Sequence, residues 1–245
     1  MEARLDDLPS QVRSTLEDFI AAAVKVSGSN LRSAILFGSA AEGRLRPTSD
    51  VNLVLVFGTV HLPELEQLRV HLSFAHAAIR LEVMFLEETE IELAGQAFAV
   101  KFTDILARHR ILHGTDVFAS LKITREATLN RLRQVLLNLA LRLRERYAFV
   151  GAREEQLNGV IADISGPLRA CAATILGLEG EHVSSPREAL QTLARSLPGR
   201  DRTELLASIS EVRQEHELEP VVANATIDSL LELLRAMYLH IGTWS

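Results

Sequence analysis

The sequence predicts an α+β protein, with a small mixed sheet and flanking helices followed by an all-α helical bundle. Short apolar, β-branched runs are confined to the N-terminal part of the chain, whereas from about residue 96 onward apolar residues recur at helical spacing. Hydrophobic residues make up 47% of the chain and aromatic residues only 5%, so Leu, Ala, Val and Ile must build the core. The boundary is expected around 112–123, which gives domains at 1–116 and 117–245.

The N-terminal domain is expected to alternate strands with helices. The expected strands are 33–37, 51–57 and 79–86, and the expected helices are 10–26 and 62–78. Ser10 is the expected N-cap of the first helix, and Gly28 is expected to follow its end. A strand, a helix and a further strand in this order indicate a crossover and a sheet of mixed character.

The C-terminal part is predicted to be almost entirely helical. Helices are expected at 96–109, 124–149, 154–177, 186–197, 201–216 and 223–241. Pro198-Gly199 and Pro220 are expected to separate helices. Apolar residues repeat along one helix at the spacing of a bundle core or of a pocket wall, namely Leu129, Leu132, Leu136, Leu139 and Leu143.

Composition narrows the set of partners. The net charge of −6 and the pI near 5.8 provide no general basic field, so a nucleic-acid partner is not expected. A single cysteine, Cys171, excludes an internal disulfide and reads as a buried small hydrophobe. The sequence shows neither a signal peptide nor an apolar run long enough for a membrane span, which predicts a cytoplasmic protein with no membrane partner.

Two short motifs, ten residues apart, carry the candidate chemistry. Gly38-Ser39 ends a predicted strand, and a glycine turn there can present backbone N–H groups and a hydroxyl to phosphate oxygens. Asp50 and Asn52 lie two residues apart at the start of the next strand, so they are expected on one face. Two acids in these places would bind a divalent metal ion, and Glu82 on the third strand offers a further carboxylate.

Leu36-Phe37-Gly38-Ser39 and Ser49-Asp50-Val51-Asn52-Leu53 resemble the signature of the DNA polymerase β-type nucleotidyltransferase superfamily. The chain is similar to small bacterial nucleotidyltransferases with a C-terminal helical domain, including aminoglycoside nucleotidyltransferase-like proteins. The Leu112-His113-Gly114 turn resembles the end of their catalytic domain, and the resemblance covers 31–116.

The resemblance implies magnesium-dependent transfer of a nucleoside monophosphate from an NTP to a hydroxyl of a small-molecule acceptor, in a protein that can form a homodimer. It implies nucleotide-binding roles for Gly38, Ser39, Arg44 and Ser49. It implies catalytic and metal-binding roles for Asp50, Asn52 and Glu82.

Three positions depart from the family pattern. Asn52 is neutral where the family has a carboxylate, the third acid is Glu82 where Asp is commoner, and Glu42 stands where a basic residue is frequent. Arg44 or Arg46 can take the place of that basic residue.

The departures leave two further interpretations open. One is a catalytically inactive nucleotide-binding or regulatory pseudoenzyme, which the neutral Asn52 favours. The other is a fused HEPN-type ribonuclease, suggested by the loose Arg-x4-His pattern of Arg235 and His240, whose alternative interpretation is a pair of cations at a helix end.

Overall fold

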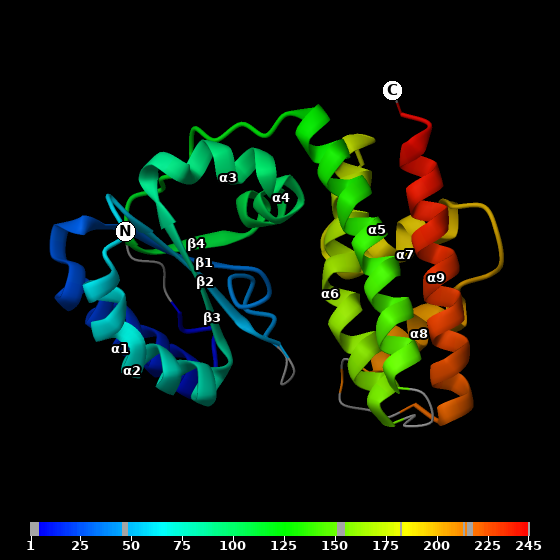
Figure 1. Ribbon diagram of the computed structural model, residues 1–245, viewed down its shortest axis with the longest axis horizontal. Coiled ribbons are helices and arrows are strands. Elements are labelled where there is room, and N and C mark those ends of the chain that lie inside the picture. Colours follow the sequence, from blue (N-terminus) through cyan, green and yellow to red (C-terminus); the bar gives the residue numbers. More distant parts are fainter. Residues whose placement is uncertain are drawn as a thin grey trace. The chain divides into compact units, whose positions relative to one another are not determined.

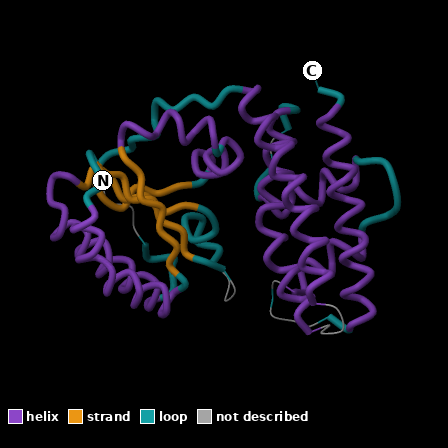
Figure 2. The backbone as a smooth tube through the Cα atoms, in the orientation of Figure 1, coloured by secondary structure: helices purple, strands orange, loops and turns teal. Residues whose placement is uncertain are grey.

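The chain, described here from a computed structural model, folds into two compact units. The structure describes residues 5–45, 49–150, 155–181, 183–212, 214 and 218–244. The first unit comprises Met1–Ala97 and Phe102–Ile123, and the second comprises Phe98–Lys101 and Thr124–Ser245. Figure 1 shows strands in the first unit and helices alone in the second, and Figure 2 marks the same division by secondary structure.

A four-stranded mixed sheet forms the centre of the first unit. Its strands are β1 (Leu31–Phe37), β2 (Val51–Phe57), β3 (Leu81–Glu87) and β4 (His109–Gly114), in the order β3-β2-β1-β4. β1 is antiparallel to both β2 and β4, whereas β2 and β3 are parallel and joined by the crossover helix α2 (Leu62–Ile79). The predicted α+β fold with a mixed sheet is therefore confirmed.

Helices cover both faces of this sheet. Figure 1 shows α1 (Ser10–Ser27) beside α2 on one face, with α3 (Ile91–Ala97) and α4 (Ala99–Ala107) on the other. Two short 3-10 turns, η1 (Gly28–Asn30) and η2 (Glu88–Glu90), lead into β1 and α3.

Alternate residues of the central strands enter two separate cores, because successive strand side chains point to opposite faces. Leu36 and Leu53 belong to the cluster beneath α1 and α2. Ile35 and Val54 belong to the cluster on the other face, where they join Phe102 of α4. Residue parity along β1 and β2 thus decides which layer each side chain meets.

The sequence did not predict β4. A single helix was expected over 96–109, but α3 and α4 end before His109, and the chain then pairs with β1. β4 is an edge strand whose side chains are half-buried or exposed, so it lacks the apolar run that marks a central strand. The expected capping role of Ser10 was also wrong: Ser10 is the first helical residue and Pro9 precedes it without a side-chain cap.

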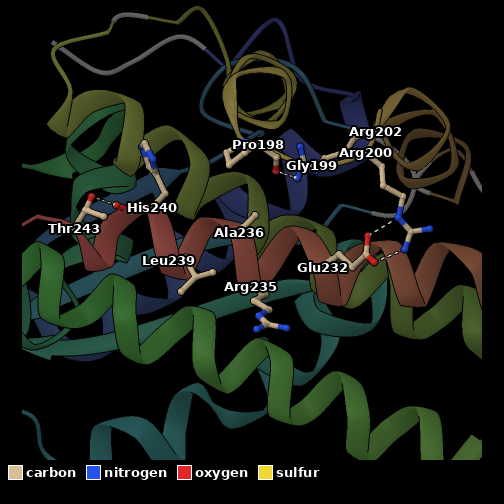
Figure 3. A pocket seen from close by; sticks show the side chains of 10 residues that line it. All are labelled: Pro198, Gly199, Arg200, Arg202, Glu232, Arg235, Ala236, Leu239, His240 and Thr243. Atoms are coloured by element: carbon tan, nitrogen blue, oxygen red, sulfur yellow. Dashed lines mark hydrogen bonds and ion pairs between the residues drawn. The ribbon is translucent and has the colours of Figure 1, made fainter.

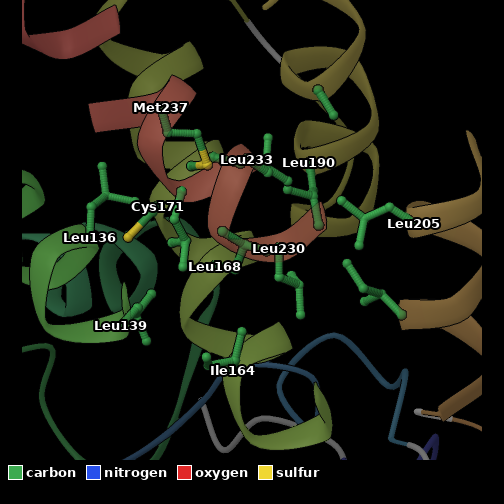
Figure 4. Close-up of a cluster of buried hydrophobic side chains, with 14 of the residues drawn as sticks. Leu136, Leu139, Ile164, Leu168, Cys171, Leu190, Leu205, Leu230, Leu233 and Met237 are labelled. Carbon is green, nitrogen blue, oxygen red and sulfur yellow. The ribbon is translucent and has the colours of Figure 1, made fainter. Parts of the chain in front are cut away.

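The second unit is a helical bundle. Its helices are α5 (Arg125–Val150), α6 (Glu155–Leu178), α7 (Pro186–Ser196), α8 (Thr203–Val212) and α9 (Pro220–Gly242). The predicted leucine stripe of α5 is buried, and Figure 4 shows its Leu136 and Leu139 near Cys171, with Leu230 and Met237 of α9 in the same cluster. Pro220 follows the predicted break between α8 and α9 and is the first residue of α9, where its missing N–H has no helical partner to lose.

One helix among the described residues has the length and hydropathy of a membrane span. Gln156–Leu178 contains an 18-residue window with a mean hydropathy of 1.3, but 61% of that window is buried inside the protein. Its apolar side chains, such as Ile161 and Leu168, belong to the core of the bundle. Burial explains its composition without a membrane.

Candidate functional site

A tight turn follows β1 at the position of the predicted phosphate-binding motif. Gly38 adopts a φ of +74°, a conformation that residues with a Cβ seldom adopt, and its N–H donates to the Arg108 carbonyl over 3.2 Å. The turn closes through the Arg44 N–H, which donates to the Ser39 carbonyl over 2.9 Å. Gly43, with a φ of +67°, ends it. The half-buried Ser39 therefore sits at the start of a backbone loop that is fixed on both sides.

The side chain of Arg108 anchors the same turn. Its Nη1 donates to Glu42 over 2.8 Å, while Nε and Nη2 donate to the two carboxylate oxygens of Asp104 over 2.7 and 2.8 Å. Burial lowers the pKa of Arg108, but the hydrogen bonds and charges of Asp104 and Glu42 outweigh it and raise that pKa above its usual value. Glu42, which departs from the family pattern, thus has a structural partner.

Sequence reasoning missed this role of Arg108. The only local signal was the i, i+4 spacing of Asp104 and Arg108, which is typical of a helix-surface ion pair. The partner that matters to the turn, Glu42, is 66 residues away in the chain.

Asn52 lies at the centre of the candidate site. In the sheet it is paired with Phe37 of β1 on one side and with Glu82 of β3 on the other. Its Nδ2 donates to the main-chain carbonyl of Asp50 over 3.2 Å. A Cβ at Gly38 would lie 3.9 Å from the same nitrogen, so the turn and Asn52 are neighbours. The structure therefore brings together residues from both sequence motifs.

The carboxylate of Asp50 binds a cation of the protein itself. Arg80 Nε donates to Asp50 Oδ1 over 2.8 Å, and the two side chains are 60% and 45% exposed. Arg80 follows α2 and its carbonyl accepts from the Val51 N–H over 3.2 Å. This ion pair joins the end of α2 to the start of β2, and the sequence contained no signal for it.

The other predicted site residues differ in their surroundings. Glu82 is exposed, and one of its oxygens lies 3.5 Å from His76 Nδ1. Arg44 is exposed, and Arg46 lies outside the described residues. Ser49 is buried, and among the described residues its Oγ has no hydrogen-bond partner. A buried hydroxyl without a partner is unfavourable, so a ligand that reached it would gain a ready hydrogen bond.

As arranged, with Asp50 engaged by Arg80, these donors do not form the magnesium site that the resemblance implies. Mg²⁺ binds oxygen atoms in near-octahedral geometry, commonly one or two carboxylates together with waters and phosphate oxygens. Within the described ranges, no three His, Cys, Asp or Glu side chains gather as metal ligands. Asp50 is paired with Arg80, Glu82 lies beside His76, and Asn52 carries no charge. The metal-binding roles of Asp50, Asn52 and Glu82 stay predictions.

The HEPN-type pattern does not produce a paired site in the bundle. Arg235 and His240 both line a groove of about 560 Å³ beside α9, but Figure 3 shows them extending from different sides of that helix. His240 Nε2 instead lies 2.6 Å from Glu179. Five residues correspond to about 140° around a helix, so the two side chains diverge.

Comparisons with known proteins identify the fold. No protein-family model matches the chain, and no curated protein matches it. The crystal structure of spectinomycin adenyltransferase AAD(9) from Enterococcus faecialis, which contains ATP and spectinomycin, is similar with a TM-score of 0.60. The match covers 91% of this chain and 99% of that chain at 16% identity. At this identity the similarity shows the fold, and it supports the resemblance noted in the sequence at that level.

Proposed function

We propose that the chain is a nucleotide-binding protein of nucleotidyltransferase fold that no longer catalyses metal-dependent transfer. The observation that carries this proposal is the neutral Asn52, which neighbours the Gly38 turn and occupies the second metal ligand's place in the motif. The nucleotide phosphates bind at the Gly38-Ser39 turn. The acceptor that an active relative would modify is then either absent or bound without reaction.

Three features support nucleotide binding. The turn presents a backbone that Gly38 and Gly43 hold in left-handed conformations, and such turns form anion-binding concavities. The similar adenyltransferase was solved with ATP, and its fold extends over nearly the whole of this chain. The buried Ser49 hydroxyl beside Asp50, which has no hydrogen-bond partner within the part of the chain that the structure describes, adds a donor close to the motif.

The loss of transfer activity follows from charge. Replacing a carboxylate by an amide removes one negative charge and one strong oxygen ligand from the metal position. Each ~1.4 kcal/mol of lost transition-state stabilisation slows a reaction about tenfold, so a defect of several kcal/mol leaves little turnover. Binding is less affected, because phosphate contacts at the turn do not pass through Asn52.

Weak magnesium-dependent transfer to a small-molecule hydroxyl is a second candidate function. The Asp50–Arg80 pair favours it, because both side chains are largely exposed, and an exposed pair contributes about 0–1 kcal/mol. A metal ion held by nucleotide phosphates can displace so weak a partner. In that case Asn52→Asp raises magnesium-dependent transfer.

Calorimetric titration of ATP and GTP into the full chain, with MgCl₂ and with EDTA, tests the proposal. We expect binding by the wild-type protein and about three- to tenfold weaker binding by Ser39→Ala, which removes one hydroxyl donor to a charged acceptor. Ser14→Ala is the matched control, since it removes an exposed serine hydroxyl from α1.

Pyrophosphate release, measured on the same samples, separates the two candidates. No release above the buffer background agrees with a binding protein. Release that disappears in Asp50→Asn would replace this proposal with the second candidate. The absence of nucleotide binding in both buffers would contradict nucleotide binding altogether.

A further inference from the structure

Arg80 holds an unusual backbone conformation beside the candidate site. Its φ is +53°, and among the described residues it is the only non-glycine residue with a positive φ. This left-handed region is unfavourable for residues with a Cβ, and glycine is the common choice directly after a helix. Arginine here is therefore an exception to the usual residue choice directly after a helix.

The local contacts fix the position of that side chain. The Arg80 N–H donates to the His76 carbonyl over 2.8 Å, and the Arg80 carbonyl accepts from Val51 over 3.2 Å. The guanidinium then donates to Asp50 from a backbone that α2 and β2 hold on both sides. The main-chain carbonyl of Asp50 in turn accepts from Asn52 Nδ2, and Asn52 pairs with Phe37, the residue before Gly38. A continuous set of contacts thus links the guanidinium to the phosphate-binding turn.

The charges of the site leave little attraction for a divalent cation. Asp50 and Glu82 are acidic, Asn52 is neutral, and Arg80 supplies one positive charge. The metal site that the resemblance implies carries three carboxylates, whereas here a single net negative charge remains among these side chains.

We propose that Arg80 is the fixed cation of this site and binds nucleotide phosphate in place of a divalent metal ion, with Asp50 orienting its guanidinium. The inference rests on the proposed nucleotide binding and adds that this binding is independent of metal. Guanidinium geometry matches phosphate oxygens, and the Arg80 side chain is 60% exposed, so an anion from solvent can reach it.

Binding of ATP and of inorganic tripolyphosphate in EDTA tests the role of Arg80. Arg80→Asn removes the guanidinium but keeps a residue type that tolerates positive φ, so the fold should persist. We expect the wild-type affinity for ATP to agree within about twofold between EDTA and MgCl₂. We expect Arg80→Asn to bind both probes about tenfold more weakly than the wild type does. Arg69→Gln, which removes another exposed, ion-paired arginine of α2, should bind as the wild type does.

Direct Mn²⁺ binding, measured by electron paramagnetic resonance without nucleotide, provides a second readout. We expect no Mn²⁺ site that depends on Asp50 in the wild-type protein. The double variant Arg80→Asn with Asn52→Asp should gain one, and a further Asp50→Asn change should abolish it. A wild-type Mn²⁺ site that Asp50→Asn removes would overturn the inference.

The outcomes separate this inference from the proposed function. Nucleotide binding that requires magnesium and is unchanged in Arg80→Asn would overturn the role of Arg80 while nucleotide binding stands. Failure to bind ATP or GTP, together with tripolyphosphate binding in EDTA that Arg80→Asn weakens, would overturn the proposed function but support Arg80 as the anion-binding cation.

Discussion

Replacing Arg108 by methionine tests how the turn after β1 is held in place. The methionine keeps much of the apolar volume of the side chain but removes all three hydrogen bonds to Asp104 and Glu42. Both carboxylates would remain, 18% and 21% exposed, without their cation. The change therefore removes the partner of two acidic groups that are mostly shielded from water.

The expected loss in free energy of unfolding lies between the values for buried and for exposed ion pairs. Removing one partner of a fully buried pair costs about 3–5 kcal/mol, whereas exposed pairs contribute about 0–1 kcal/mol. With about a fifth of each side chain still exposed, we expect Arg108→Met to lower the free energy of unfolding of the first unit by about 2–3 kcal/mol. Nucleotide binding should weaken too, because the Glu42 contact that holds the turn is lost.

Urea denaturation gives the stability change, and hydrogen–deuterium exchange of peptides from β1 and α4 locates it in the first unit. Arg13→Met is the control, because Arg13 pairs with Asp6 at 3.0 Å with side chains 38% and 71% exposed. Adding Glu42→Gln to Arg108→Met should recover part of the loss by removing one uncompensated charge. A loss in Arg108→Met no larger than in Arg13→Met would refute the reasoning.

Three further predictions concern stability and reactivity. Thermal unfolding should show that Gly114→Ala destabilises the protein far more than Gly180→Ala does. Both glycines have positive φ, but a Cβ at Gly114 would collide with the Arg32 carbonyl of β1, whereas a Cβ at Gly180 would meet no atom within 4 Å. Burial raises the pKa of Cys171 to about 12, so a thiol reagent at neutral pH should react with it only after unfolding. The hydrogen bond from Arg110 holds the pKa of Asp7 below its usual value. That stabilisation is therefore present above the unfolded pKa of ~3.9 and lost as the pH falls through the folded value, and urea titrations over this range should show the loss in the wild type but not in Asp7→Asn.

The central elements of the first unit could be predicted because their residues carry a local pattern. Apart from Asn52, Val51–Phe57 is an apolar run rich in valine, and the structure forms β2 over the same residues. The helix expected at 62–78 is α2, which ends one residue later at Ile79. The buried leucines of α5 follow a helical repeat that any packed helix must show.

β4 could not be predicted in the same way. Its residues are half-buried at the sheet edge, and only pairing with β1 makes them a strand. The helix expected at 96–109 is present as α4 over most of that range, but its last residue, His109, belongs to β4, where hydrogen bonds to a distant strand outweigh local helical propensity.

The sequence by itself determined the α+β fold class, the Gly38-Ser39 turn and the neutral Asn52, because each depends on residue type and short spacing. Only the tertiary structure decided that Arg108 holds Glu42 and that Arg80 holds Asp50, since the first pair is separated by 66 residues and the second by 30. Such pairs form when folding brings helix ends to the sheet, and their strength depends on burial and on the distances that only packing sets.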